Sequence, residues 1–331
     1  MAPLTAIQPR NPSSLYFGKI SSRGDFVKSA SGARVIALID SWAAQGMELL
    51  IANPGWKPGY DNAGPIDFLF LGTRRTHAIC GALAPSCDAS ARRFPFIAAT
   101  LFEVDDALAF LPLSPLVMER HASRQRALAQ HAAATHDAAD TLAALGENAL
   151  QVDSDQGKCR SGYAQFLART SIAALADALA LDDTQASLRQ MVLATGYLLQ
   201  PVLSNYAVAP QRGLALPLPS DPALAAPVRA WWLDLVCTFL PRADFELSVF
   251  SCRRQGRPTL IITFNGTTPA VFHALFEPDG TSELFIDIAQ AAWVEECAAR
   301  DAATFKLSSY LEHDALTLHQ LMDTFRQGFS G

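Results

Sequence analysis

The chain has few charged residues for its length, and its charges do not gather into a long basic run. Charged side chains make up 18% of the 331 residues, and the formal net charge is −6 at pH 7. A protein that binds DNA or RNA needs a basic patch to neutralise phosphates. The composition therefore gives no reason to expect nucleic acid as a partner, and the scattered charges favour no bulk charged substrate.

Cysteine pairs and long apolar runs are also scarce. The six cysteines, at positions 80, 87, 159, 237, 252 and 297, include no C-x-x-C pair, so reduced and mostly buried thiols are expected. Residues Met1–Ser14 contain three prolines and lack the apolar segment of a signal peptide. The longest apolar stretches, such as Phe94–Phe102, are too short to span a bilayer. These absences predict a soluble cytoplasmic protein without membrane insertion.

Motifs for catalysis or cofactor binding are missing as well. The chain has no H-E-x-x-H motif, no nucleophile elbow and no dinucleotide-binding glycine triplet. The pair at 18–19 fails as a phosphate loop, because Ser13 stands where that pattern needs a glycine and Ile20 where it needs a hydroxyl. His77 and Cys80 lie three apart on an expected strand and so face opposite sides, which argues against a metal site. No catalytic residue, metal site or cofactor is predicted.

What the chain does have is ample material for a core, since half of its residues are hydrophobic. Apolar runs joined by polar turns predict β-hairpins, and these are interspersed with helical patterns. Antiparallel hairpins with helices on both faces predict an α/β fold of mixed α+β topology: a three-layer αβα sandwich with a helical middle region and a second, smaller α/β half. The expected segments are a flexible lead at 1–14, a first domain at 15–150, a helical segment at 151–209 and a C-terminal α/β region at 210–331.

The expected elements follow from the same patterns. Strands are predicted at 15–20, 66–71, 77–83, 95–104, 246–252, 259–265 and 283–288. Helices are predicted at 32–51, 114–145, 163–181, 186–203, 228–240, 269–276 and 314–327. Glycine- and proline-rich segments predict a loop at 56–65 and a linker at 152–161. The proline-rich segment at 210–227 predicts either an extended connection or one central strand with proline-rich ends.

Two polar turns carry the most specific pattern of the chain. The first follows the strand at 15–20, and the second precedes the strand at 95–104. Each contains a carboxylate and at least one arginine, so their charges could join two strand ends. The candidate binding residues are Arg23, Gly24, Asp25, Phe26, Ser86, Asp88, Arg92 and Arg93.

Each residue type suggests a role in such a junction. Gly24 could reverse the chain with a positive φ, and Asp25 could accept backbone amides. Asp88 could cap the second turn in the same way, as could the serine two residues before it. Arg92 and Arg93 enter a strand on opposite faces, so only one of them can meet Asp25 or Asp88. The turns are therefore predicted to meet, with a structural role favoured over partner contact or catalysis.

An arginine pair and a tryptophan pair can each be interpreted as ordinary structure or as part of a binding surface. Arg120 and Arg124 lie on one face of an expected helix, where a solvated surface is favoured over a site for an acidic partner. Trp231 and Trp232 are adjacent on another helix, so one is expected in the core and the other at an edge, where it packs between domains or contacts a partner.

The turns carry a resemblance to a known family. Phe17–Val27, followed by a helix with Trp42, resembles the opening motif of the TagF (ImpM) family of type VI secretion-associated proteins, and Pro85–Pro95 resembles its second motif. Leu214–Pro217 and Phe305–Leu311 are similar to later landmarks of its longer members. The resemblance makes 15–150 a TagF-type N-terminal domain.

The chain departs from the family pattern in places. Ser21 stands where members usually have proline, Ala91 where they have glycine, and Phe68 and Phe70 where tryptophan is usual. The resemblance implies a cytoplasmic accessory protein that represses a type VI secretion system after translation, through the system's forkhead-associated scaffold protein, with no enzymatic activity. Two alternatives stay open: a small hydrolase or phosphatase-like regulator using Asp25, Asp88 and Arg92, and a structural subunit of the secretion machine.

Overall fold

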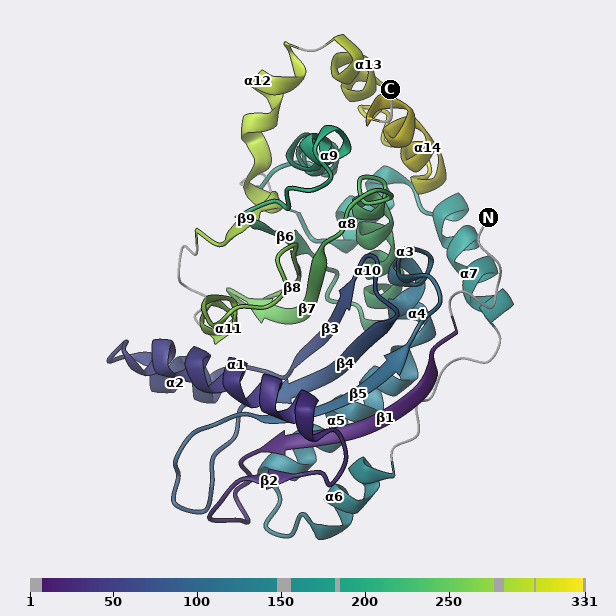
Figure 1. Cartoon of the computed structure of the whole chain (residues 1–331). Helices are drawn as coiled ribbons and strands as arrows, with labels where there is room; N and C mark the ends of the chain where they lie inside the picture. The colour runs from purple at the N-terminus through teal and green to yellow at the C-terminus, as the bar shows by residue number, and fades with distance from the viewer. Residues whose placement is uncertain (1–7, 148–155, 182–184, 277–282, 301, 330–331) are drawn as a thin grey trace.

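Nine strands form one twisted sheet within the part of the chain that the structure describes (Figure 1). The computed structural model describes residues 8–147, 156–181, 185–276, 283–300 and 302–329. The strand order is β2-β1-β5-β4-β3-β7-β8-β6-β9, and neighbours run antiparallel except β6 and β9, which are parallel. The strands are β1 (Arg10–Gly18), β2 (Val27–Lys28), β3 (Ile66–Gly72), β4 (His77–Ala84), β5 (Phe96–Glu103), β6 (Gly213–Pro217), β7 (Glu246–Arg254), β8 (Arg257–Thr263) and β9 (Phe285–Asp287).

β3 and β7 join the two halves of the chain within this sheet. β3 pairs with β4 on one side and with β7 on the other, so that Leu69 lies opposite both Cys80 and Val249. Strands β1 to β5, from the first part of the chain, lie on the β3 side of this junction, and β6 to β9, from the later part, lie on the β7 side. The predicted segments 15–150 and 210–331 therefore share one sheet.

Helices α1, α2 and α11 cover one face of the sheet (Figure 1). They span Ala33–Ile51, Trp56–Asn62 and Pro269–Phe276. α1 and α11 come from different halves of the chain and pack closely against each other. Glycine at position 46 permits this contact, because a Cβ there would lie 2.3 Å from Cδ1 of Phe272. The indole of Trp42 donates a hydrogen bond of 3.0 Å to the carbonyl of Thr268 just before α11.

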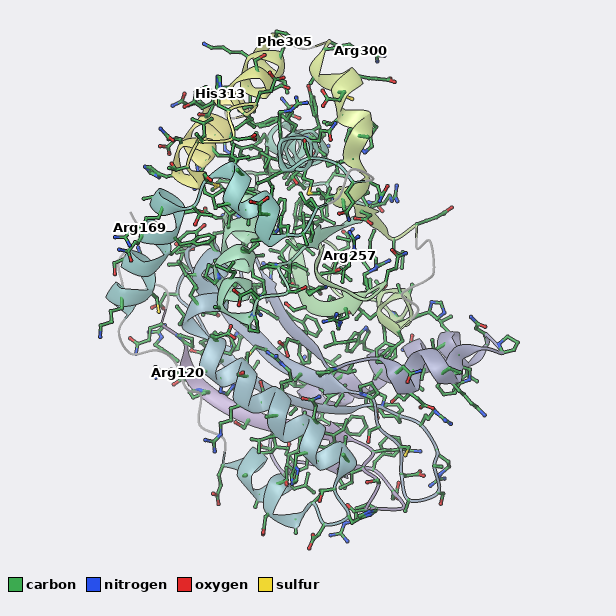
Figure 2. All side chains as sticks on the ribbon, turned by 180° about the vertical axis from the view of Figure 1, so that it is seen from behind. Arg120, Arg169, Arg257, Arg300, Phe305 and His313 are labelled. Atoms are coloured by element: carbon green, nitrogen blue, oxygen red, sulfur yellow. The ribbon has the colours of Figure 1, made fainter. Side chains whose placement is uncertain are left out.

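The remaining helices cover the opposite face and one end of the sheet. α5 and α6 lie over β1, β4 and β5, and α10 lies against the short helices that follow β5. α9 and α12 to α14 gather at the β6–β9 end, where the rear view labels Arg300, Phe305 and His313 (Figures 1 and 2). These elements are α3 (Ala107–Phe110), η2 (Leu111–Leu113), α4 (Ser114–Val117), α5 (Glu119–Ala134), α6 (Ala139–Gly146), α7 (Gln156–Arg169), α8 (Ile172–Ala178), α9 (Leu188–Ser204), α10 (Pro222–Cys237), η3 (Ile288–Trp293), α12 (Val294–Ala298), α13 (Ala302–Tyr310) and α14 (Leu318–Phe329).

The predicted α/β class, with a mixed sheet between helical layers, is confirmed. None of the described helices is long and apolar enough to cross a membrane. No disulfide joins the six cysteines, all of which lie within the described residues, and Cys80 and Cys252 are buried.

Several boundaries differ from the sequence-based expectation. β1 begins at Arg10, so residues 10–14 belong to the sheet and not to a flexible lead; residues 1–7 lie outside the described residues. The expected loop at 56–65 contains α2, and the expected helix at 114–145 is divided into α4, α5 and α6. The described end of the expected linker, from Gln156 onward, is the first turn of α7.

The tryptophan pair also differs from expectation. Trp231 and Trp232 are both fully buried on α10, and their rings contact each other at 4.5 Å between centroids. The indole of Trp232 donates a 2.9 Å hydrogen bond to the carbonyl of Pro217. Both rings fit inside because α10 is enclosed by η2, α4 and α9, so neither tryptophan remains for a partner.

Candidate functional site

The two polar turns meet because β1 ends at a glycine. Gly18 has a φ of 140°, and a Cβ at this position would lie 2.1 Å from the carbonyl oxygen of Pro95 and 2.7 Å from Cα of Phe96. Gly18 also pairs with Phe96 in the sheet. A side chain here would separate the end of β1 from the start of β5, so glycine permits the contact on which the site depends.

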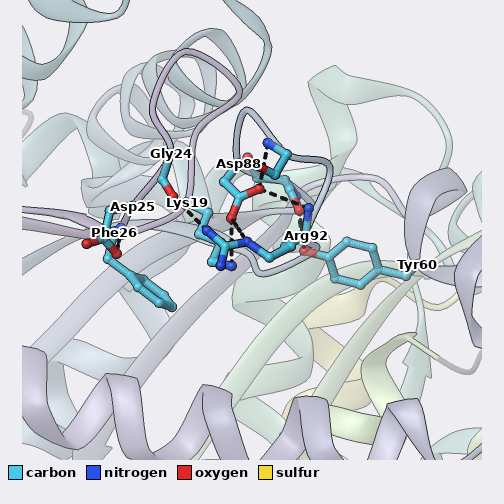
Figure 3. A network of polar contacts seen from close by, with 9 residues as sticks. Lys19, Gly24, Asp25, Phe26, Tyr60, Asp88 and Arg92 are labelled. Carbon is cyan, nitrogen blue, oxygen red and sulfur yellow. Dashed lines mark hydrogen bonds and ion pairs between the residues drawn. The ribbon is translucent and has the colours of Figure 1, made fainter.

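The carboxylate of Asp88 is the centre of the junction (Figure 3). Its Oδ2 accepts hydrogen bonds from Lys19 Nζ at 2.9 Å and from Arg92 Nε at 2.7 Å. Its Oδ1 accepts from the backbone amides of Ser90 at 2.9 Å and Arg92 at 3.0 Å. Asp88 is 2% exposed, so four donors satisfy a carboxylate that water does not reach.

These contacts keep Asp88 ionised. Burial alone raises the pKa of its carboxyl, but hydrogen bonds from Lys19, from the amides of Arg92 and Ser90, and from the Arg92 guanidinium outweigh burial and hold the pKa well below its usual range. A carboxylate that is both ionised and saturated with donors is neither a proton donor nor a free nucleophile. Its arrangement suits a structural role.

Backbone hydrogen bonds complete the junction. Arg92 bridges the turns, because its Nη2 donates to the carbonyl of Gly24 at 2.7 Å while its Nε contacts Asp88. The amide of Ala89 donates to the carbonyl of Arg23 at 2.8 Å. The structure therefore brings the first and second turns together through side chains and main chain alike.

Asp25 is not part of this junction, contrary to the sequence-based prediction. It is exposed, and its Oδ1 accepts a 2.8 Å hydrogen bond from the amide of Phe26. Within the described residues it has no cationic partner, and Lys19, which was not predicted as a site residue, pairs with Asp88. Gly24 also differs from expectation, since it is not among the glycines with positive φ and offers its carbonyl instead. The turn points the Asp25 side chain outward while its backbone faces Arg92 (Figure 3).

Phe26 is exposed but held in place. Its ring is stacked on Phe17 at 5.3 Å between centroids and meets Phe94 edge-on at 4.9 Å. Lys19 Nζ lies 5.1 Å from the ring centroid. With 42% of Phe26 accessible, the first turn presents a fixed aromatic surface next to the free carboxylate of Asp25. Rigid aromatic side chains of this kind are common at the centres of protein interfaces.

Arg93 faces away from Asp88, as the alternation of strand residues predicts, but it is not free. Its Nε and Nη2 bind the two oxygens of Asp61 at 2.7 and 2.6 Å. Its guanidinium carbon lies 5.8 Å from the ring centroid of Trp56. This bidentate pair fastens the second turn to α2, which the sequence analysis had interpreted as a loop.

Ser86 is fixed through its backbone. The Tyr60 hydroxyl donates to the carbonyl of Ser86 at 3.1 Å and accepts from its amide at 3.0 Å. Burial raises the pKa of Tyr60 far above its usual value, so this hydroxyl stays protonated. The Ser86 hydroxyl has no hydrogen-bond partner among the described residues, so its predicted capping role is wrong. A pocket of about 320 Å³ lies beside this contact, between α2 and the second turn.

Lys19, Tyr60 and Asp61 are therefore site residues that the sequence analysis missed. Lys19 follows the glycine that ends β1, and its sequence context fits no phosphate loop and gives no other indication of its contact with Asp88. Tyr60 and Asp61 lay in a segment whose glycines and prolines indicated a loop. The sequence around Tyr60 and Asp61 does not distinguish them from ordinary loop residues. Only the fold brings them next to the second turn.

Other candidate residues lie elsewhere. His77 is exposed and lies 3.6 Å from Glu103, whereas Cys80 is buried on the same strand. No cluster of metal-binding side chains occurs among the residues that the structure describes. Arg120 and Arg124 are exposed on α5, consistent with a solvated helix face.

His121, between them on α5, is fully buried instead. Its Nε2 lies 3.0 Å from Oγ1 of Thr100 on β5, and Gln125 donates to the same hydroxyl at 3.2 Å. Burial, assisted by the charge of Arg124, lowers the pKa of His121 to about 4. This histidine is neutral at pH 7 and belongs to the packing between helix and sheet.

Comparisons with known proteins place the site within one domain. Residues 15–150 match the model of the TagF N-terminal domain, described as type VI secretion system-associated. Among solved structures, the crystal structure of PA0076 from Pseudomonas aeruginosa PAO1 is 27% identical over a match covering 27% of this chain and 42% of that chain, with a TM-score of 0.25. The match thus spans less than half of that protein. No curated protein matches the chain.

Proposed function

We propose, from the match of residues 15–150 to the TagF N-terminal domain, that the protein is a post-translational repressor of a type VI secretion system. It acts in the cytoplasm by binding the forkhead-associated scaffold protein of that system. The observation that carries the proposal is the family match, which contains both polar turns and the buried Asp88 network between them.

The geometry divides the predicted binding residues into two groups. Asp88 and Ser86 are buried and hold the shape of the turns. Arg23, Asp25 and Phe26 are exposed, and Phe26 is fixed by aromatic contacts. We assign partner binding to the exposed group, because an ordered aromatic side chain beside a free charge gives affinity and specificity at little cost in entropy.

The hydrolase alternative fits less well. It needs Asp25, Asp88 and Arg92 around one open cleft. Asp88 is instead buried and bound by four donors, while Asp25 lies outside the network. The third alternative, a structural subunit of the machine, predicts a different genetic result and is separated from repression by the experiment below.

Deletion of the gene, followed by measurement of secreted tube protein, tests the proposal. A repressor gives increased secretion when it is deleted. Abolished secretion would identify a required component of the machine, and unchanged secretion would remove the support for repression.

Binding is tested with purified proteins. The charge reversal Asp25→Arg is expected to reduce capture of the scaffold protein at least tenfold while leaving the melting temperature unchanged. Phe26→Ser should reduce capture to a similar extent, and it should also lower the melting temperature because it removes the ring contacts with Phe17 and Phe94. Glu48→Arg, on the exposed face of α1, is the matched control and should bind as the wild type does. Equal binding by all variants would place the partner surface elsewhere.

A further inference from the structure

A polar pocket lies in the C-terminal half, outside the matched residues 15–150. It has a volume of about 360 Å³ and is bounded by the β7–β8 hairpin, the ends of β6 and β9 and the start of η3. A cavity of this size is within the range of small-molecule sites. Arg254, Arg257 and Thr259 line it from the hairpin, and Gln185 and Gln290 line it from other segments.

The hairpin turn fixes two arginines side by side at this pocket. Gln255 and Gly256 both have positive φ, 48° and 76°, as a two-residue turn of type I′ requires. Arg254 and Arg257 are consequently direct cross-strand partners, and their side chains lie on the same face of the sheet. Arg257 is labelled in the rear view (Figure 2). Two adjacent guanidinium groups concentrate positive charge beside the cavity, in a protein whose net charge is negative.

Arg254 is both held in place and incompletely paired. Its guanidinium carbon lies 5.1 Å from the ring centroid of Phe285, which is buried on β9. Its Nη1 is buried and has no hydrogen-bond partner among the residues that the structure describes. A buried guanidinium N–H without an acceptor is unfavourable, and an oxygen of a bound anion would satisfy it once the guanidinium turns toward the pocket.

One acidic side chain, Asp287, lines the pocket, and one of its oxygens is engaged by the backbone. Asp287 Oδ1 accepts a 3.0 Å hydrogen bond from the amide of Ala289 and caps the turn that follows β9. The nearby Arg212 donates to the carbonyl of Phe285 at 3.0 Å, which adds a further positive charge at this edge.

We propose that this pocket binds a phosphate monoester. A dianionic phosphate presents oxygens to two planar guanidinium groups, and the amide side chains of Gln255 and Gln290 supply further donors. The pocket is larger than its arginine-lined part, so it also accommodates the group that carries the phosphate. This site is independent of the partner surface assigned to the first turn.

Calorimetric titration with inorganic phosphate and with O-phosphoserine, at constant ionic strength, tests the proposal on the full chain. Both probes should bind the wild type, and acetate should bind at least several-fold more weakly. Arg254→Gln should weaken phosphate binding roughly tenfold or more, the loss expected for one charge-assisted contact. Arg253→Gln is the matched control, because Arg253 is the preceding residue, exposed on the opposite face of β7. Arg253 contacts the turn through the carbonyl of Gly256, so the melting curve of this variant is compared first, and in the folded variant the affinity should change less than about twofold.

Circular dichroism and melting curves establish that the variants fold. Should Arg254→Gln fail to fold, Arg254→Lys keeps the charge but loses the planar fork and is expected to weaken phosphate binding as well. Three results would overturn the proposal: no binding by the wild type at tens of millimolar phosphate, unchanged binding by a folded Arg254 variant, or an equal loss in Arg253→Gln.

Discussion

Replacing Lys19 by methionine isolates the buried ion pair between the two turns. Lys19 is 8% exposed, and methionine fills similar apolar volume without the charge. The substitution leaves Asp88 with Arg92 Nε and two backbone amides, so the carboxylate stays partly satisfied. The expected loss of stability is therefore smaller than for a carboxylate deprived of every partner.

The magnitude follows from the contacts that remain. Breaking a fully buried ion pair costs about 3–5 kcal/mol, and one hydrogen bond to a charged group contributes about 1.5–3 kcal/mol. Because Arg92 still contacts Asp88, we expect a loss of about 2–3 kcal/mol for Lys19→Met. Unfolding entropy is about 2.1 cal/mol/K per residue, or about 0.7 kcal/mol/K for a cooperative chain of 331 residues. The melting temperature should then fall by about 3–4 °C.

The pH dependence separates this mechanism from a packing defect. The pKa of Asp88 is lowered by folding, so its contribution to stability is present above the unfolded pKa of about 3.9 and is lost as pH falls toward the folded value. Lys19→Met weakens that contribution. The difference in melting temperature between wild type and variant should be largest at neutral pH and should shrink below about pH 4.

Differential scanning calorimetry between pH 3 and pH 8 measures both effects. Lys28→Met is the control, since Lys28 is exposed on the edge strand β2 and should change the melting temperature by less than about 1 °C. An effect of Lys19→Met no larger than the control, or one that persists unchanged in acid, would refute the role assigned to the pair.

Three other substitutions test neighbouring parts of the structure, each by calorimetry. Gly18→Ala places a Cβ 2.1 Å from a backbone oxygen, so it should prevent normal folding or lower the free energy of unfolding by more than about 4 kcal/mol. Gly24→Ala is its control, because a Cβ there meets no atom within 4 Å and should change the free energy of unfolding by less than about 1 kcal/mol. Ala91→Gly should raise stability by about 0.5–1 kcal/mol, because Ala91 has a φ of 59°; a loss would show that the left-handed conformation carries no strain. The pKa of His121 is lowered to about 4, so its contribution is complete above about pH 6.5 and declines by up to about 1.4 kcal/mol per pH unit between 6.5 and 4. His121→Gln should remove that slope, and an unchanged slope would assign it to other groups.

The sequence was sufficient to predict that the two turns meet, but not which atoms join them. Each turn holds an acid and an arginine, and that pattern suggested carboxylate–guanidinium pairs. In the structure, Arg92 binds one carboxylate and one backbone carbonyl, and Lys19 supplies the second cation. The direction of Asp25 depends on the dihedral angles of a turn, which residue types alone leave undetermined.

Strong periodicity made other elements predictable. The helix at 269–276 and the hairpin at 66–83 agree closely with α11, β3 and β4, because their apolar patterns are regular and their ends carry proline, glycine or polar residues. The pairing of β3 with β7 could not be predicted from such patterns. Strands almost 180 residues apart meet through tertiary contacts, and each of them looks like an ordinary hairpin strand in the sequence.

The position of Ala91 links the resemblance to the geometry of the second turn. The resemblance led to an expectation of glycine at this position, and the structure places Ala91 at a φ of 59°, the left-handed region in which glycine is favoured. This conformation returns the chain so that the amide of Arg92 reaches Oδ1 of Asp88, and the guanidinium of the same residue then reaches Oδ2. The turn therefore requires the conformation whichever residue occupies the position. A chain that keeps Asp88, Arg92 and Lys19 can accept alanine here, because the network they form holds the turn in place against a modest local strain.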